Sequence, residues 1–238
     1  MTAWLNTIKI IAHRGSSVEH TENTKTAILA AFREGAEMIE VDIRATGDHH
    51  LIVFHDQSLR RLAKKSWLIS RSPWNEIKDI TLRRNEHILS LEELLTLAKG
   101  KFYLNLEIKV RGYEQPILEL LHSNGMAKQV LISSKHLSVI KHFRELDARI
   151  PLALVVNYAN IRVKSDINQA TAYGIEGVHP INFRTSKSLI SYAHNLGLSV
   201  RPYSINAARR MCYLFSIGAD GIMTDKPTLL AQVVHDLK

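Results

Sequence analysis

Short apolar runs recur along the chain, and longer amphipathic stretches separate them. Eight runs have the length and composition of strands, at residues 8–12, 38–43, 102–108, 130–133, 152–156, 177–179, 198–203 and 221–224. Between most of them apolar residues return at steps of three and four, as in Leu189, Ile190 and Ala193, which is the spacing of an amphipathic helix. Strands and helices are therefore expected to alternate.

The residues at the ends of the expected helices support this alternation of strands and helices. Six helix-like stretches are followed by glycine, at positions 35, 100, 125, 174, 197 and 218, where the residue past a helix end often needs positive φ. Asn23 or Thr24 can cap the first helix. Ser90 and Glu93 form a capping-box pattern, and Asn206 stands before the helical run from residue 207. These signals predict helix boundaries close to the ends of the apolar runs.

Eight strand–helix units favour an α/β protein, a closed (β/α)8 TIM barrel. An open doubly wound sheet has the same periodicity, but no Gly-rich dinucleotide fingerprint follows the first strand. Residues 1–238 are expected to form a single domain, because barrels of this kind routinely reach that length. Residues 56–89 are too many for a plain connection and are expected to form a short insertion at the barrel mouth.

Charge and composition narrow the choice of partners. The chain has 31 Lys and Arg against 23 Asp and Glu, and the net charge of +8 favours anionic partners. Aromatic and basic residues do not interleave along a groove-like stripe, so a small-molecule substrate is expected rather than nucleic acid. The one cysteine, Cys212, excludes an internal disulfide and is predicted to be buried in a helix. A cytoplasmic location without stable membrane insertion is expected, and the oligomeric state is left open.

Chemically active side chains follow the first strand directly. In a TIM barrel the C-terminal ends of the strands carry the active site. His13, Arg14 and Gly15 stand at the exit of the run 8–12, where the guanidinium of Arg14 offers a planar fork for phosphate. His55 closes another β-like run, residues 51–54. Because imidazole titrates near neutrality, His13 and His55 are candidates for an acid–base pair.

Carboxylates recur at alternate positions of two strands. Glu40 and Asp42 lie two residues apart, so both project from one face of their strand. Glu107 and Lys109 repeat the spacing on the stretch 102–109. Paired carboxylates inside a barrel need neutralising, and a hard divalent cation does this with oxygen ligands. The alternative is salt bridges from Arg or Lys. Glu107 can complete a metal site, while Lys109 can hold a phosphate oxygen or pair with Glu107.

Together these motifs resemble the glycerophosphodiester phosphodiesterase family, of the bacterial cytoplasmic type. The resemblance runs through His13-Arg14-Gly15, Glu22-Asn23-Thr24, Glu40 and Asp42, His55-Asp56, Asn105 to Lys109, and residues 200–206 and 218–227, which covers nearly the whole chain in order. The family implies a TIM barrel of the phospholipase-C-like phosphodiesterase type.

The resemblance also implies roles for individual residues. His13 and His55 would be the catalytic pair, Glu40, Asp42 and Glu107 the ligands of one Mg²⁺ or Ca²⁺ ion, and Arg14 and Lys109 the phosphate contacts. Glu22 would support the site from its loop. Tyr203 stands where the family usually has tryptophan and would keep an aromatic wall for the substrate. Thr21 replaces a usual proline, which is expected to loosen the loop that holds Glu22.

The activity implied by the resemblance is metal-dependent hydrolysis of glycerophosphodiesters, such as glycerophosphocholine or glycerophosphoethanolamine, to sn-glycerol 3-phosphate and an alcohol. One alternative is a phospholipase D-like enzyme that hydrolyses lysophospholipids or sphingolipids, for which Trp67, Leu68, Ile69 and Trp74 could form an apolar entrance or could simply pack the insertion. A second alternative is a non-catalytic phosphate- or nucleic-acid-binding barrel, prompted by the net charge alone.

Overall fold

The computed structural model describes residues 3–157 and 163–237 of the chain. All eight predicted strands are present, with ends that match or are shifted by up to three residues. They are β1 (Ile10–His13), β2 (Met38–Ala45), β5 (Tyr103–Ile108), β6 (Val130–Ser134), β7 (Leu152–Val156), β8 (Gly177–Pro180), β9 (Ser199–Val200) and β10 (Ile222–Thr224). Each of these strands pairs with its neighbours in parallel.

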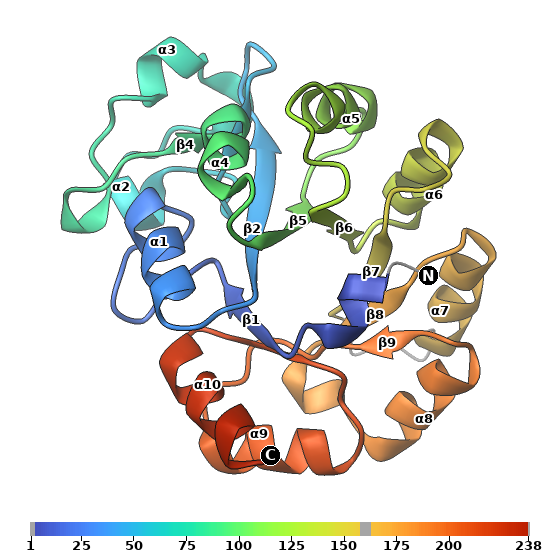
Figure 1. Cartoon of the computed structure of the whole chain (residues 1–238). Helices are drawn as coiled ribbons and strands as arrows, with labels where there is room; N and C mark the ends of the chain where they lie inside the picture. The colour runs from blue at the N-terminus through green and yellow to red at the C-terminus, as the bar shows by residue number, and fades with distance from the viewer. Residues whose placement is uncertain (1–2, 158–162, 238) are drawn as a thin grey trace.

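The strands close into a barrel. Their order is β10-β1-β2-β5-β6-β7-β8-β9. The ring closes between the two ends of this order, because the backbone N–H of Asp220 donates to Val200 and that of Met223 donates to Pro202. The helices surround the strands (Figure 1). The α/β class and the (β/α)8 barrel are thereby confirmed.

The outer layer consists of helices that follow the strands. They are α1 (Lys25–Arg33), α4 (Leu91–Ala98), α5 (Glu114–Ser123), α6 (Leu137–Leu146), α7 (Val163–Ala172), α8 (Lys187–Asn195), α9 (Ala208–Ser216) and α10 (Pro227–Asp236). Thr24 caps α1, and Ser90 and Glu93 form the expected capping box at α4. All six junction glycines have positive φ, as predicted.

Two sequence-based expectations about α9 are wrong. Its N-cap is Ala207, because the side chain of Asn206 is engaged with Thr224 and Asp225 instead. Cys212 is exposed rather than buried, since the buried face of the helix is formed by Met211 and Leu214.

The core has two parts, inside and outside the strands. Outward-facing strand residues such as Ile39, Val41 and Leu104 pack against the helices. Inside the barrel, Ile11 and Met38 belong to a smaller apolar cluster. The 3₁₀ helix η1 (Ala3–Thr7) adds Leu5 to this inner cluster, so the N-terminal segment closes the end of the barrel opposite the mouth. Apolar packing at that end leaves the mouth for polar residues.

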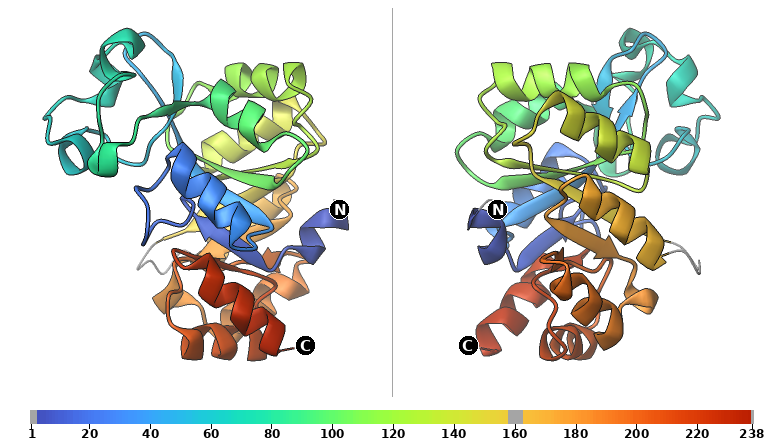
Figure 2. Two further views of the ribbon diagram at one scale, coloured as in Figure 1. Left: turned by 60° about the vertical axis from the view of Figure 1, so that its left-hand side comes forward. Right: turned by 90° about the vertical axis from the view of Figure 1, so that its right-hand side faces the viewer.

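The expected insertion lies between β2 and α4. It begins with β3 (Leu51–Val53), which pairs antiparallel with β2, and ends with β4 (Leu89–Ser90). Between them lie α2 (Arg60–Ala63), η2 (Ile69–Arg71), α3 (Trp74–Ile77) and η3 (Arg83–Asn85). The segment has its own small core, which includes Leu59, Leu62 and Ile69. It projects on the side opposite to the N-terminus (Figure 2, left).

Because β3 extends the barrel sheet through β2, we propose that the insertion and the barrel form one domain. Within the described residues, no helix is long and apolar enough to cross a membrane. The cytoplasmic location stays a prediction.

Candidate active site

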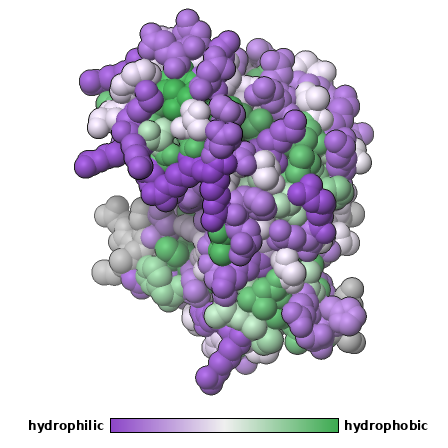
Figure 3. Space-filling model, turned by 90° about the vertical axis from the view of Figure 1, so that its left-hand side faces the viewer, coloured by the Kyte–Doolittle hydropathy of each residue, from purple (hydrophilic) through white to green (hydrophobic). Residues whose placement is uncertain are grey.

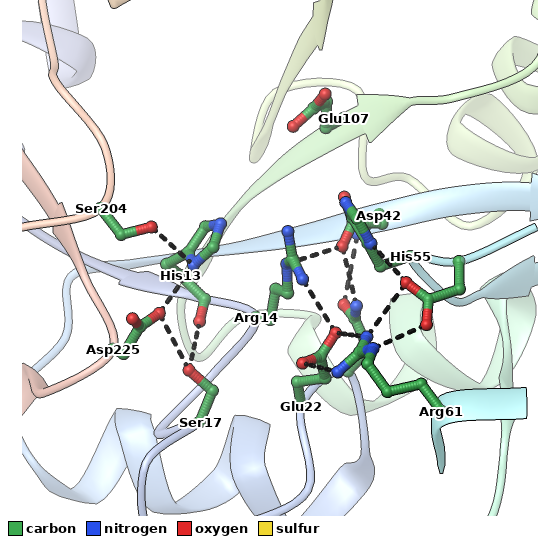
Figure 4. Close-up of polar contacts among 12 residues, drawn as sticks. His13, Arg14, Ser17, Glu22, Asp42, His55, Arg61, Glu107, Ser204 and Asp225 are labelled. Atoms are coloured by element: carbon green, nitrogen blue, oxygen red, sulfur yellow. Dashed lines mark hydrogen bonds and ion pairs between the residues drawn. The ribbon is translucent and has the colours of Figure 1, made fainter. Parts of the chain in front are cut away.

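Strand register brings the predicted site residues to one end of the barrel. His13 on β1 is the cross-strand partner of Glu40 on β2, and Asp42 is the partner of Glu107 on β5. Partners in register share a face, here the interior of the barrel. Figure 4 shows His13 and His55 on either side of Arg14 and Asp42, with Glu107 beyond them. Residues far apart in the sequence therefore meet at the mouth.

Three carboxylates form a compact cluster. Glu40, Asp42 and Glu107 are each buried, and one oxygen from each lies within 4.8 Å of the others. Burial and the neighbouring Asp42 carboxylate raise the pKa of Glu40. Burial would also raise the pKa of Asp42, but the charges of Arg14 and Lys109 outweigh it and lower that pKa. Full ionisation of all three carboxylates is therefore unfavourable when only Arg14 and Lys109 offset their charge.

Two basic side chains occupy part of this cluster. Lys109 places Nζ 2.9 Å from Asp42 Oδ1 and 2.5 Å from Glu107 Oε1. Arg14 places Nε 3.1 Å from Asp42 Oδ2 and donates from its terminal nitrogen to Glu22. The salt-bridge alternative is therefore realised for Asp42 and Glu107. Glu40 differs, because its Oε1 is buried and has no hydrogen-bond partner among the described residues.

This unpartnered oxygen supports a fit to a hard cation. Oxygen ligands are the kind that Mg²⁺ and Ca²⁺ take.

His13 is held by a carboxylate behind it. Its Nδ1 lies 2.7 Å from Asp225 Oδ1 and 3.1 Å from Ser204 Oγ. The pKa of Asp225 is lowered to about 2, with burial outweighed by hydrogen bonds from His13, Asn206 and Ser17. An ionised carboxylate only accepts, so Nδ1 carries the proton and Nε2 is left on the side of Glu40, 4.0 Å from its Oε2. Burial opposes a charge on His13, yet Asp225 and Glu40 raise its pKa.

His55 has the same arrangement on the opposite side of the cluster. Its Nδ1 lies 2.8 Å from Asp56 Oδ1, and Arg61 donates to both oxygens of that carboxylate. Burial is the main cause of a lowered pKa for His55, with Arg14 and Lys109 acting in the same direction. The two histidines are thus shifted in opposite directions, each with Nδ1 engaged by an aspartate.

Arg61 joins the insertion to the site. Besides Asp56, it forms two hydrogen bonds to Glu22, at 2.6 and 2.7 Å. The loop that carries Glu22 is also tied to the insertion by Thr21, whose hydroxyl donates to the carbonyl of Arg83. The expectation that Thr21 loosens this loop is therefore wrong, because its hydroxyl provides an anchor that proline lacks. Tyr203 is half-buried, with its ring 6.2 Å from that of His13.

Several site residues were missed by sequence reasoning. Asp225 and Ser204 contact His13, and Asn206 holds the second oxygen of Asp225 through a 2.5 Å hydrogen bond. Asn23, which had been given no role beyond a helix cap and a place in the Glu22-Asn23-Thr24 motif, donates to Asp42 at 2.8 Å. The available signal was position, since residues 204–206 and 225 also follow barrel strands.

Comparison with known proteins identifies the family. The model of the glycerophosphoryl diester phosphodiesterase family matches residues 13–229. This chain belongs to that family. A glycerophosphodiester phosphodiesterase of Bacillus altitudinis is 29% identical, with 97% of this chain and 99% of the relative covered. One from Caldanaerobacter subterraneus is 26% identical, covering 95% and 97%. The expected family and enzyme class are confirmed, and the non-catalytic alternative falls away.

Solved structures show the same barrel. A phosphodiesterase of Oleispira antarctica, in complex with the product sn-glycerol-3-phosphate, has a TM-score of 0.87 at 24% identity and covers 98% of this chain and 99% of its own. The phosphodiesterase of Thermotoga maritima has a TM-score of 0.82 at 22% identity and covers 94% and 98%. Family members hydrolyse glycerophosphodiesters and depend on a divalent metal ion. Among the described residues, this chain offers one acidic cluster for such an ion.

Proposed function

We propose that this phosphodiesterase releases sn-glycerol 3-phosphate from small deacylated head-group esters, such as glycerophosphocholine and glycerophosphoethanolamine, with His13 and His55 as the catalytic pair. The observation that carries the proposal is the symmetry of the two histidines about the carboxylate cluster. Each has Nδ1 held by an aspartate, so each presents Nε2 for proton exchange with a phosphodiester between them.

The proton transfers follow from this arrangement. One imidazole takes the proton of a glycerol hydroxyl as that oxygen attacks phosphorus and a new P–O bond forms. The other gives a proton to the alcohol oxygen as the old P–O bond breaks, so the alcohol leaves neutral and a cyclic phosphate remains. Water then opens the cyclic phosphate with the two imidazoles in exchanged roles, which gives sn-glycerol 3-phosphate. Asp225 and Asp56 fix the ring orientation and the Nδ1–H tautomer, which keeps Nε2 available throughout.

Glu40, Asp42 and Glu107 would hold one Mg²⁺ or Ca²⁺ ion, whose positive charge would offset that of the phosphate and polarise its P–O bonds. Arg14 and Lys109 border the same space and would hold phosphate oxygens, which matches their donors and charge. Glu22 orients Arg14 and Arg61. Tyr203 would bound the glycerol or head group on the His13 side.

Lysophospholipids are the second candidate substrate. Of the four apolar residues considered for an entrance, Ile69 is buried and Trp74 packs on the insertion core. Trp67 and Leu68 are 43% and 38% exposed. Their exposure on the insertion that carries Arg61 favours testing substrates with an acyl chain.

The test is release of sn-glycerol 3-phosphate from glycerophosphocholine and glycerophosphoethanolamine, with Mg²⁺, with Ca²⁺ and with EDTA. We expect metal-dependent release that His13→Ala and His55→Ala each reduce at least about 100-fold. His235→Ala, at an exposed histidine, is the control and should retain full activity. Activity from folded His13→Ala comparable to that of the unmodified chain would refute the catalytic pair. Turnover of lysophospholipids alone would reassign the substrate.

A further inference from the structure

The insertion carries half of the excess positive charge of the protein. Residues 56–89 include eight Lys and Arg against four Asp and Glu, a net charge of +4 out of +8 for 238 residues. All eight basic side chains are exposed. Only Arg61 forms an ion pair with an acidic group among the described residues. The seven basic side chains of the insertion without an ion pair among the described residues are Arg60, Lys64, Lys65, Arg71, Lys78, Arg83 and Arg84.

Apolar side chains are exposed within the same segment. Trp67 and Leu68 are adjacent in sequence, and Lys65 places its ammonium group 4.8 Å from the centre of the Trp67 ring. Figure 3 shows apolar surface on the insertion surrounded by hydrophilic residues. We call Lys64, Lys65, Trp67 and Leu68 the insertion patch. An indole and a leucine beside unpaired lysines combine the two features by which peripheral proteins bind bilayers.

The backbone holds this patch in place. Leu59 donates its N–H to the carbonyl of Trp67, and Ile69 donates to Gln57, so residues 57–69 form a closed loop. This loop turns Leu59 and Ile69 into the small core and leaves Trp67 outside. Because the geometry is preformed, exposure of the patch does not depend on a conformational change.

The patch is also tied to the active site. Arg61 lies in the same loop and contacts both Glu22 and Asp56, the partner of His55. A surface that binds the patch therefore meets the mouth of the barrel rather than its opposite end. The insertion is a projecting lobe (Figure 2), which suits a broad flat partner better than a strand lying in a groove.

We propose that the insertion patch docks this enzyme peripherally on anionic phospholipid bilayers, with the barrel mouth at the membrane surface. The positive charge of the patch favours an anionic surface. The exposed indole of Trp67 and its neighbour Leu68 favour a lipid interface over single-stranded nucleic acid, because proteins that bind nucleic acid in this way place several aromatic side chains along a groove. Acidic residues near the patch are few. Asp56, Glu76, Asp79 and Glu86 belong to the insertion, and Glu19 lies in the neighbouring loop. Of these, Asp56 is already paired with Arg61. The inference does not depend on the catalytic assignments.

The experiment is co-sedimentation of the full chain with vesicles of phosphatidylcholine alone and with about one-third phosphatidylglycerol. We expect binding to the anionic vesicles at least about ten-fold stronger, weakened by salt. Each basic residue near such a surface contributes about five-fold, so the loss of two lysine charges alone weakens binding roughly 30-fold. Lys64→Glu with Lys65→Glu also adds two repelled negative charges and should therefore weaken binding by more than about 30-fold. Trp67→Ser with Leu68→Ser should weaken it at low and high salt alike, because the apolar contribution is not screened.

The matched control is Lys101→Glu with Lys128→Glu. These exposed lysines precede β5 and β6 at the other end of the barrel, and the pair changes the net charge by the same amount. It should alter binding no more than about two-fold. Equal losses in both charge pairs would overturn the proposal in favour of unspecific attraction. Absence of binding, or patch-dependent binding to poly(U) without binding to vesicles, would overturn it as well. An unchanged circular-dichroism spectrum and an unchanged urea midpoint verify that each variant is folded.

Discussion

Asp225→Asn isolates the contribution of a residue that touches a catalytic histidine without facing the substrate. In the native site Nδ1–H of His13 donates to Asp225, and Ser17 and Asn206 also donate to this carboxylate. An asparagine there must turn its NH₂ toward one of these donors. If the NH₂ faces His13, Nδ1 must accept a hydrogen bond, the proton moves to Nε2, and His13 can no longer take up a proton there.

The structure indicates the size of two effects. Loss of the correct tautomer removes most of the acid–base contribution of His13, so kcat should fall between about 100-fold and 10⁴-fold. The pKa of Asp225 is about 2 in the folded protein against an ordinary value of about 3.9. A lowered pKa adds stability above the unfolded value that is lost as pH falls through the folded one. The substitution should therefore cost about 2 kcal/mol of unfolding free energy near pH 7.

The assay combines steady-state kinetics with urea unfolding at neutral pH. KM should change little, because Asp225 orients His13 rather than binding substrate. Asp220→Asn is the matched control, since Asp220 also pairs with a histidine, His194, at 2.9 Å but away from the mouth. If Asp225→Asn keeps kcat within about three-fold while remaining folded, the proposed role of the Asp225–His13 pair is wrong.

Three further predictions concern metal binding, backbone strain and acid stability. Glu107→Gln should raise the Mg²⁺ concentration for half-maximal activity at least about ten-fold, measured by metal titration, and an unchanged midpoint would remove Glu107 from the metal site. Gly15→Ala should lower the free energy of unfolding by at least about 3 kcal/mol in urea, because the added Cβ would lie 2.6 Å from the Ala27 backbone and the residue has a φ of +84°. Gly100→Ala is the control and should cost only about 1 kcal/mol, because φ is +72° there but the added Cβ would have no atom within 4 Å. Burial and the charge of Arg201 lower the pKa of His179 to about 3. As pH falls, the unfolded chain therefore binds a proton at this histidine before the folded protein does, and the free energy of unfolding should fall by about 1.4 kcal/mol per pH unit below about pH 6.5. His179→Gln should flatten this dependence, and identical slopes in the two proteins would contradict the prediction.

The fold was predictable because each strand–helix unit of the barrel leaves a regular pattern of apolar runs and junction glycines in the sequence. Each junction glycine adopts the positive φ that its position suggested, and each parallel strand left an apolar run that was visible without an alignment. Boundaries were less certain where a strand is very short. β9 comprises only Ser199–Val200, while the apolar pattern extends to Tyr203, because residues past the strand still pack on the inner cluster.

The site was predictable to the extent that its residues alternate along regular strands. Glu40 and Asp42 were placed on one face by their spacing alone, and Glu107 joined them because parallel neighbours align in register. No pattern of this kind marks a residue whose importance comes from a contact across the barrel. Asp225 is 212 residues from His13 in sequence and reaches it only because β10 and β1 are neighbours once the barrel closes.

The same distinction explains why His179 escaped notice. Its strand, Gly177–Pro180, reads as an ordinary apolar run, and a histidine there gives no signal of its depth. In the structure both of its ring nitrogens are buried without a hydrogen-bond partner among the described residues, beside the buried guanidinium of Arg201. Two positive charges in that space would repel each other, so protonation of His179 is expected to destabilise the barrel. The interior polar residues on this side therefore constrain the pH range of the fold, while the carboxylates nearer β2 serve the chemistry.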